Sequence, residues 1–344
     1  LNMSLKNLSV KIKIPKFFKE KLNNKRINLI YKKFEKSLNI KQNFIVAVSG
    51  GPDSLALAFL TKVYALKNRL KPKFIIVDHK LRQESTREAK KVKNLLKKYS
   101  IDLEILTWKG KKPKTNIQSL ARKKRYQLLI DKCHKLKIKN VLIAHHQDDL
   151  FENFFIRISR GSGLKGLISF DEKTEYNNIQ ILRPLLDQKK EDLLFISKNI
   201  FKFYIEDPYN KDQKFQRIKI RKSMEELQKF GLEKEKFLIT IKNLKHSNNV
   251  VNFYFNENLE KNTFFSSKQN KLFINKEFFD QPYEVIFRSL SNSLKSLGNK
   301  YYPVRGKKLD KIIEEIQKNS YVKVTLGGCI LEKINQTVII SKEF

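Results

Sequence analysis

The 344-residue chain is 40% hydrophobic and contains 25 Phe residues, which is enough apolar material for the cores of two domains and argues against global disorder. Its 72 Lys and Arg residues exceed its 35 Asp and Glu residues, so the net charge is +37. This excess favours a polyanionic partner, nucleic acid before an anionic membrane. Compositional drift toward Lys, Asn, Ile and Phe is the alternative explanation.

Cysteine usage and hydropathy exclude several other classes of protein. The two cysteines, Cys133 and Cys329, are far apart in sequence and form no CxxC pair, so neither a disulfide framework nor a structural zinc site is expected. No apolar run approaches the roughly 20 residues of a membrane span, and the first residues lack the apolar core of a secretion signal. We therefore expect a cytoplasmic protein without a membrane partner. The sequence leaves the oligomeric state open, with a homodimer as one alternative.

Residues 1–43 form a basic N-terminal extension that is rich in Lys and Asn. Apolar residues recur at helical spacing from Ile27 to Leu38, which predicts a helix packed on the domain that follows. For the rest of the extension, packed chain and a basic arm are both open.

From Phe44 onward, apolar and β-branched strands alternate with helices. The elements expected in this region are Phe44–Val48, Asp53–Lys67, Phe74–Asp78, Ser85–Tyr99, Leu103–Trp108, Asn116–Leu136, Val141–Ala144 and Gln147–Ser159. Such alternation predicts an α/β domain, a Rossmann-like parallel sheet with helices on both faces. Ligands of these sheets bind beyond the carboxyl ends of the strands, so the three segments after the first, second and fourth strands should gather at one edge. These segments are Ser49–Gly51, Asp78–His79 and Ala144–His146.

The segment Ser49–Ser54, SGGPDS, connects the first strand to the first helix of this domain. Two adjacent glycines let the backbone turn and approach a ligand, and the helix N-terminus suits an anion. Ser49 and Ser54 add hydroxyl donors. Asp53 would repel a bound anion unless a cation, most simply Mg²⁺, offset its charge. A capped strand-to-helix turn without a ligand is the alternative.

The lysine of a Walker-type phosphate loop is absent from this segment. A loop that offers only backbone N–H groups and hydroxyls suits pyrophosphate. The matching chemistry is cleavage of ATP between the α- and β-phosphates, which leaves an adenylated substrate.

The SGGPDS segment after an apolar strand resembles the signature of the N-type ATP pyrophosphatases, the PP-loop superfamily. Further motifs resemble those of the tRNA(Ile)-lysidine synthetase family, in its order and roughly its spacing, from Phe44 to about Lys222. They are VDHKLRQES (Val77–Ser85), ARKKRY (Ala121–Tyr126), AHHQDDLFEN (Ala144–Asn153), RGSGLKGL (Arg160–Leu167), RPLL (Arg183–Leu186) and DPYNKDQKFQRIKIR (Asp207–Arg221). The later VTLGGCILEK resembles the end of the C-terminal domain of some members.

The resemblance implies a ligase that uses ATP and Mg²⁺. In that family, ATP adenylates the C2 oxygen of the wobble cytidine in an isoleucine tRNA with a CAU anticodon. The ε-amine of free lysine then displaces AMP and forms lysidine, with pyrophosphate as the other product. By resemblance, the loop residues bind ATP, and Asp53 is catalytic and a Mg²⁺ ligand. The loop residues are Ser49, Gly50, Gly51, Pro52, Asp53 and Ser54.

The resemblance also assigns roles to carboxylates on the helix expected over Gln147–Ser159. Asp149 and Glu152, which share a helix face at i, i+3, are expected to bind lysine and to serve the reacting centre, with His145 in the same substrate site. Capping of the helix N-terminus is the alternative for these carboxylates and for the neighbouring Asp148. The family reads DDQ-x-ET where this chain reads DDLFEN, so no role is carried over to Leu150 or Asn153.

Basic and strand-end residues complete the expected site. Asp78 and His79 stand where the adenosine of ATP would bind, with a satisfied turn as the alternative. Arg122 is expected at the ATP phosphates and Arg125 at the tRNA, with a solvated helix face as the alternative. Arg160, in the glycine-rich loop, is expected to stabilise charge as the adenylate forms. The last motif is expected to form the wall around the anticodon through Asp207, Asn210, Arg217 and Arg221.

Four domains are predicted: the extension 1–43, a catalytic domain 44–222, a helical and mixed linker 223–297, and a small α+β module 298–344 for tRNA recognition. In the module we expect a helix over Lys307–Gln317 and strands over Tyr321–Val324, Cys329–Ile334 and Thr337–Ser341. Two other functions remain open: a PP-loop tRNA thiolase, which the scarcity of cysteines disfavours, and a non-catalytic RNA-binding relative.

Overall fold

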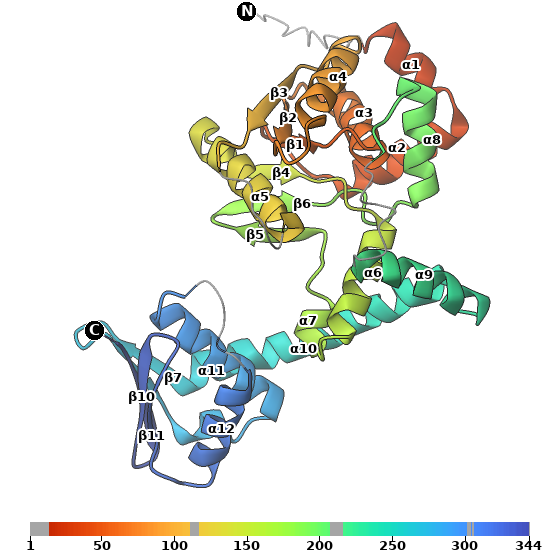
Figure 1. Cartoon of the computed structure of the whole chain (residues 1–344). Helices are drawn as coiled ribbons and strands as arrows, with labels where there is room; N and C mark the ends of the chain where they lie inside the picture. Colours follow the sequence, from red (N-terminus) through yellow and green to blue (C-terminus); the bar gives the residue numbers. More distant parts are fainter. Residues whose placement is uncertain (1–13, 111–116, 207–215, 301–303, 305, 344) are drawn as a thin grey trace, which may run out of the picture. The chain divides into compact units, whose positions relative to one another are not determined.

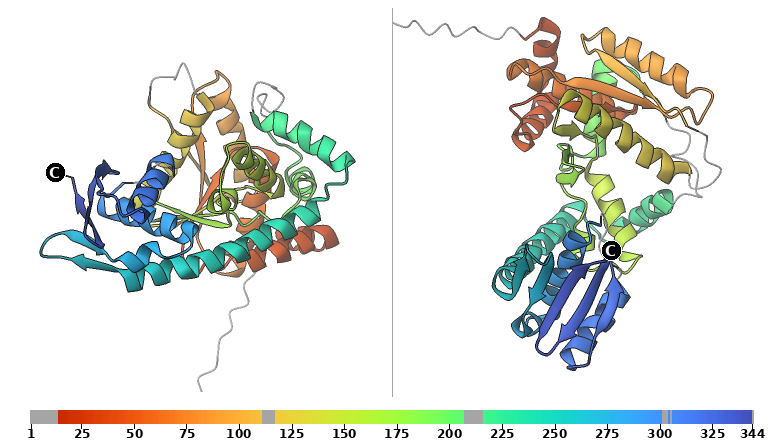
Figure 2. Two further views of the ribbon diagram at one scale, coloured as in Figure 1. Left: turned by 90° about the horizontal axis from the view of Figure 1, so that it is seen from below. Right: turned by 90° about the vertical axis from the view of Figure 1, so that its left-hand side faces the viewer.

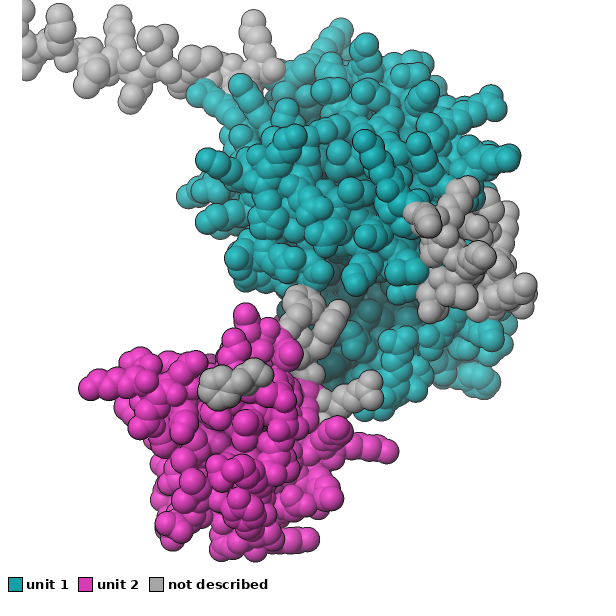
Figure 3. Space-filling view, turned by 60° about the vertical axis from the view of Figure 1, so that its left-hand side comes forward, with its two compact units in different colours: residues 1–231 teal, residues 232–344 magenta. Residues whose placement is uncertain are grey.

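The computed structural model describes residues 14–110, 117–206, 216–300, 304 and 306–343. The chain divides into two compact units, with the division between Gly231 and Leu232 (Figure 1 and Figure 3). Within the described ranges, every helix is too short or too polar to cross a lipid bilayer.

The first unit is built on a six-stranded sheet with the order β3-β2-β1-β4-β6-β5. Five neighbouring strands run parallel, and β5 pairs antiparallel with β6 at one edge. The strands are β1 (Ile45–Val48), β2 (Lys73–Asp78), β3 (Leu103–Thr107), β4 (Asn140–Leu142), β5 (Lys173–Tyr176) and β6 (Ile179–Leu182). The apolar β1 lies at the centre, where Ile45 pairs with Lys73 on one side and Val141 on the other.

Helices cover both faces of this sheet because β1 is apolar on both (Figure 1 and Figure 2). Val46 and Val48 pack in one core cluster and Ile45 and Ala47 in another. The first face carries α1 (Lys16–Leu22), α2 (Lys25–Ser37), α3 (Pro52–Lys67), α4 (Ser85–Lys97) and α8 (Lys190–Phe201), and the second carries α5 (Ile117–Leu136). The predicted Rossmann-like architecture is therefore confirmed.

Most predicted elements of this unit are present with shifted ends. The helix expected over Ile27–Leu38 begins earlier, at Lys25, because the side chain of Asn24 accepts hydrogen bonds from the N–H groups of Arg26 and Ile27. Helix α1 and strand β5 were not expected. The described part of this unit also contains α6 (Gln147–Ile158) and α7 (Leu164–Leu167), which lie between β4 and β5 in the chain, and α9 (Gln216–Lys229), which follows α8.

The second unit combines the long helix α10 (Lys234–Asn262) with a five-stranded antiparallel sheet of order β7-β8-β11-β10-β9. Its core lies between one sheet face and two helices, α11 (Tyr283–Leu297) and α12 (Gly306–Gln317), with the short 3₁₀ helix η2 (Lys276–Phe279) beside them. The strands are β7 (Thr263–Ser266), β8 (Lys271–Ile274), β9 (Lys323–Leu326), β10 (Cys329–Ile334) and β11 (Thr337–Lys342).

This division differs from the predicted domain boundaries. Helix α9 runs across residue 223 and belongs to the first unit, and β8 pairs directly with β11 across the expected boundary at residue 297. Residues 263–342 therefore contribute to one sheet rather than to a linker and a separate module. The predicted role of this region in tRNA recognition stays a prediction.

Candidate active site

The loop between β1 and α3 is fixed from within by one hydroxyl group. The Ser54 Oγ accepts the backbone N–H groups of Ser49 and Gly50 at 3.0 and 3.1 Å and donates to the Gly51 carbonyl at 3.0 Å. The Ser49 hydroxyl lies 3.1 Å from the same oxygen. Ser54 therefore holds the turn that brings the N-terminus of α3 to the carboxyl edge of the sheet.

The same loop is also held by hydrogen bonds from α8 and from the segment that follows α8. Gly50 has φ +87°, and the N–H of Ile205 donates to its carbonyl at 2.9 Å. The Ser197 hydroxyl, on α8, donates to the Pro52 carbonyl at 2.5 Å. A Cβ on Gly50 would lie 2.7 Å from Val92 Cγ2 and 2.8 Å from Ile205 Cδ1.

Substitution of Gly50 by alanine is therefore expected to lower the free energy of unfolding by about 1–3 kcal/mol, through strain at positive φ and overlap with its neighbours. Thermal unfolding would measure the loss. Gly163→Ala is the matched control, because Gly163 has φ −70° and open space around its Cα. Equal melting temperatures for the two variants would contradict the expectation.

The carboxylates of Asp53 and Asp149 meet at one histidine. Asp53 lies in the first turn of α3 and Asp149 in the first turn of α6, which follow the neighbouring strands β1 and β4. His146 Nε2 is 3.6 Å from Asp53 Oδ2 and 3.6 Å from Asp149 Oδ2. The other Asp53 oxygen, Oδ1, is buried and has no hydrogen-bond partner among the described residues.

His146 is also the N-cap of α6. Its Nδ1 accepts the N–H of Asp148 at 3.2 Å, and its own N–H donates to Asp149 Oδ2 at 3.0 Å. The capping alternative that the sequence left open is therefore present for Asp149. Burial lowers the pKa of His146, but its contact with Asp53 and the charges of Asp149 and Asp53 outweigh this effect and raise the pKa.

His145 points into a cluster of arginines. Its Nδ1 accepts from Arg183 Nε at 3.1 Å, and its Nε2 lies 3.4 Å from Arg122 Nη2. Burial lowers the pKa of His145 well below its usual value. The Asp149 charge opposes this shift, and the charges of Arg122 and Arg183 add to it. His145 is therefore neutral and serves as an acceptor for these guanidinium groups.

Arg122 and Arg125 extend this positive region along α5. Arg122 donates to the Tyr126 hydroxyl at 3.1 Å. Burial is the main cause that lowers the pKa of Arg125, and the like charges of Arg122 and Arg217 add to this shift. No carboxylate in the described part of the chain lies within ion-pair distance of Arg122, Arg125 or Arg183. The cluster is accordingly suited to an anion.

His79 borders this cluster, and its burial and the nearby charge of Arg125 lower its pKa to about 4. The unfolded chain takes up a proton on His79 near pH 6.5, so the folded state loses stability as the pH falls from about 6.5 toward about 4. We expect His79→Asn to reduce the drop in melting temperature between about pH 7 and about pH 5. An unchanged drop would show that His79 titrates alike in both states.

Asp78 is engaged by the turn that follows β2. Its carboxylate accepts from the Lys80 N–H at 3.0 Å, the Ser85 hydroxyl at 2.8 Å and the Thr86 hydroxyl at 2.6 Å. Burial raises the pKa of Asp78, but these hydrogen bonds outweigh it and lower the pKa. The Asp78 carboxylate therefore accepts hydrogen bonds within its own turn, which is the alternative that the sequence allowed. Its contact with ATP stays a prediction.

Glu152, on α6, faces α9. Its side chain is 2% exposed, its Oε1 accepts from Arg221 Nε, and its Oε2 lies 4.0 Å from Arg217 Nε without a hydrogen bond to any described residue. Burial raises the pKa of Glu152, and Arg221 opposes part of this shift. The structure thus joins three predicted residues, Glu152, Arg217 and Arg221, and leaves one buried carboxylate oxygen of Glu152 without a hydrogen-bond partner among the described residues.

Some predicted residues lie outside this cluster. Arg160 is on the exposed loop between α6 and α7, and its side chain makes no hydrogen bond or ion pair with the described residues. Asp207 and Asn210 lie outside the described residues. In contrast, Arg183 and His146 belong to the site although no role was predicted for them. Only the RPLL and AHH motifs that contain them could have drawn attention to them.

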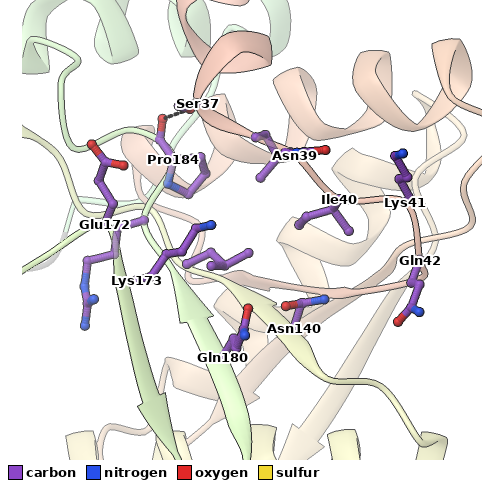
Figure 4. Close-up of a pocket in the computed structure, with 13 residues that line it drawn as sticks. Ser37, Asn39, Ile40, Lys41, Gln42, Asn140, Glu172, Lys173, Gln180 and Pro184 are labelled. Carbon is purple, nitrogen blue, oxygen red and sulfur yellow. Dashed lines mark hydrogen bonds between the residues drawn. The ribbon is translucent and has the colours of Figure 1, made fainter.

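A cavity of about 370 Å³ lies elsewhere, on the sheet face that carries α2 (Figure 4). The cavity is lined by Ser37, Leu38, Asn39, Ile40, Lys41, Gln42, Asn140, Glu172, Lys173, Gln180, Leu182, Arg183 and Pro184. None of these was predicted as a site residue, and among them only Arg183 also contacts the cluster around His145.

Comparison with known proteins identifies the family. Residues 20–227 match the model of the PP-loop domain, ATP_bind_3. The tRNA(Ile)-lysidine synthase of Wolbachia pipientis wMel is 35% identical over 307 residues, which cover 87% of this chain and 70% of that protein. That of Orientia tsutsugamushi is 35% identical over 311 residues, covering 87% and 69%. The chain belongs to the tRNA(Ile)-lysidine synthase family.

Family membership confirms the resemblance read from the motifs, and with it an enzyme of the carbon–nitrogen ligase class with an ATP-binding PP-loop domain. The solved U34-tRNA thiolase NcsA from Methanococcus maripaludis, which carries a [4Fe-4S] cluster, is 18% identical with a TM-score of 0.55 over 64% of this chain and 79% of its own. This likeness supports the α/β fold described above for this chain.

Proposed function

We propose that this chain adenylates the C2 oxygen of the wobble cytidine in a CAU-anticodon isoleucine tRNA with ATP and then joins the ε-amine of free lysine to C2. The products are lysidine, AMP and pyrophosphate. One observation carries the proposal: Asp53 of the phosphate loop and Asp149 of the expected lysine site both lie 3.6 Å from His146 Nε2. A loop for ATP and a carboxylate for an amine thus share one edge of the sheet.

ATP binding would use the loop and the cluster around His145. The N–H groups at the start of α3 face the edge where pyrophosphate would lie. Arg122, whose Nη2 lies 3.4 Å from His145 Nε2, would bind a phosphate or the adenylate. The buried, unpartnered Asp53 Oδ1 fits a cation, and no group of three or more potential ligand side chains in the described ranges would hold a metal alone. A Mg²⁺ ion there would draw its other ligands from phosphates and water and neutralise phosphate charge.

Lysine binding would use carboxylates on α6. Asp149 and the free Oε2 of Glu152 can accept hydrogen bonds from an ammonium group, and each such charge-assisted bond is among the stronger kinds. The guanidinium groups of Arg217 and Arg221 border the same carboxylate and can contact the anticodon backbone. The site would thus hold a cationic and a polyanionic substrate side by side.

The direct test supplies purified protein with ATP, Mg²⁺, labelled lysine and an unmodified isoleucine tRNA with a CAU anticodon. We expect ATP-dependent label in the tRNA, and none with the same tRNA carrying a GAU anticodon, which lacks the wobble cytidine. Absence of label, with the tRNA shown to be competent by an established synthase, would refute the proposal.

The thiolase alternative has little chemical support. Burial raises the pKa of Cys133 to about 12, so its thiol stays protonated, and Cys329 is buried in the core of the second unit. Mass analysis of the product tRNA for sulfur would decide. A non-catalytic relative would consume no ATP in the presence of tRNA.

We also propose that the second unit binds tRNA through the sheet face opposite α11 and α12. There, the register places Phe264, Phe273 and Ile339 in one row across β7, β8 and β11, and the Phe264 side chain is 68% exposed. Lys271 and Lys323 belong to the same face. The exposed ring of Phe264 and the nearby Lys271 suit an unpaired base and a phosphate, whereas Lys323 is paired with Glu332 at 3.2 Å.

Phe264→Ala is expected to weaken tRNA binding by about 10-fold, because one stacked base contributes about 1–3 kcal/mol. Fluorescence anisotropy with labelled tRNA would measure the change. Phe253→Ala is the matched control, since Phe253 is a 65% exposed phenylalanine on α10 of the same unit. Equal losses for both variants would remove the sheet face from the proposal.

A further inference from the structure

His146 uses both of its ring nitrogens, and no predicted role accounts for this. The His146 side chain is 5% exposed, so water does not compete for it. Nδ1 accepts the N–H of Asp148 at 3.2 Å, whereas Nε2 faces one oxygen each of Asp53 and Asp149 at 3.6 Å. The residue thus connects the backbone at the start of α6 with carboxylates on two helices.

The hydrogen bond at Nδ1 determines where the ring proton lies. A neutral imidazole that accepts at Nδ1 must carry its proton on Nε2. The tautomer thus gives an N–H directed at the two carboxylates. At 3.6 Å the donor is outside the usual 2.7–3.2 Å range for either oxygen, so a small shift would commit it to one of them.

We propose that His146 is a positioning residue whose Nε2–H holds Asp53 of the phosphate loop and Asp149 of the lysine site in register. Without this donor, two carboxylates would face each other across the start of α3 and α6 and repel. The inference rests on the proposed function for the identity of the two substrates. Its consequence is that loss of the Nε2–H misaligns ATP and lysine, while loss of the Nδ1 acceptor only weakens the helix cap.

Two amide variants separate these consequences. His146→Asn places an oxygen near the position of Nδ1 and keeps an efficient N-cap, but it does not reach the carboxylates. His146→Gln places its amide nitrogen near the position of Nε2 and loses the cap. We therefore expect an unchanged melting temperature for the Asn variant and a lower one for the Gln variant.

Catalysis should follow the opposite order. Misplacement of reactants by about 1 Å costs about 100-fold in rate, so kcat for lysine transfer should fall by about that factor in His146→Asn and recover at least about 10-fold in His146→Gln. Lysine affinity, measured by equilibrium dialysis without ATP or tRNA, should change by less than about 3-fold in either variant, since His146 aligns rather than binds lysine.

Wild-type protein assayed in parallel distinguishes failure of the proposed function from failure of the inference about His146. A wild-type chain that adds no lysine to tRNA overturns the proposed function and this inference with it. An active wild-type chain overturns only the inference if His146→Asn keeps its kcat, or if the kcat values of both variants follow their melting temperatures. The crossed pattern of stability and rate supports it.

Discussion

The Asp53→Ala variant is expected to release pyrophosphate from ATP, in the presence of tRNA, at least about 100-fold more slowly than the wild-type chain. Asp53 supplies a buried oxygen without a hydrogen-bond partner among the described residues, at the N-terminus that faces the phosphates. Alanine would remove the carboxylate that is proposed to hold Mg²⁺, so the phosphates would lose the cation that neutralises their charge. A coupled pyrophosphate assay measures the rate.

Asp102→Ala is the control for this variant. Asp102 is an exposed carboxylate just before β3, at the opposite edge of the same sheet, so its removal should leave pyrophosphate release unchanged. Because Asp53 accepts no short hydrogen bond in the fold, both variants should melt close to the wild-type temperature. Undiminished turnover by Asp53→Ala would sink its assigned role.

The Asp149→Asn variant is expected to raise KM for lysine by about 10- to 100-fold, which corresponds to loss of a charge-assisted hydrogen bond of about 1.5–3 kcal/mol. Pyrophosphate release measured without lysine should persist, because Asp149 is proposed to bind the amine rather than ATP. Asparagine retains an acceptor for the His146 N–H, so the cap of α6 is preserved.

Asp148→Asn tests whether the effect belongs to the position or to the total charge. It removes the same charge one residue earlier in the same turn of α6. A smaller rise in KM for Asp148→Asn supports direct contact of lysine with Asp149. An equal rise in both variants would mean that the field of the acidic turn, rather than one carboxylate, attracts the amine.

The architecture of the first unit was predictable where a strand is buried on both faces. Strand β1 reads as an uninterrupted apolar run, so its place at the centre of a parallel sheet follows from composition. Strand β5 was missed because Lys173–Tyr176 is a polar edge strand. The turn after it uses Asn177 and Asn178 at φ +49° and +59°, and an Asn-Asn pair is only a weak sign of a hairpin.

The second unit was less predictable because its sheet depends on non-local pairing. Strand β8 pairs with β11, more than sixty residues later, so neither shows its partner in the local pattern. Non-local contacts also limited how much of the candidate active site could be predicted. The carboxylates of Asp53 and Asp149 meet because they follow neighbouring parallel strands, which the alternation of elements implied. The contact of Arg183 with His145 depends on how the end of β6 lies against β4, which no local pattern contains.

The hydrogen bonds that Ser197 and Ile205 donate to the phosphate loop limit how far the first unit can be shortened. Ser197 binds the Pro52 carbonyl, and Ile205 binds and covers Gly50, so the loop obtains part of its support from a segment about 150 residues later in the chain. A fragment that ends after β6 would contain every residue of SGGPDS and still lack these contacts. The smallest autonomous ATP-binding fragment must therefore extend at least through Ile205.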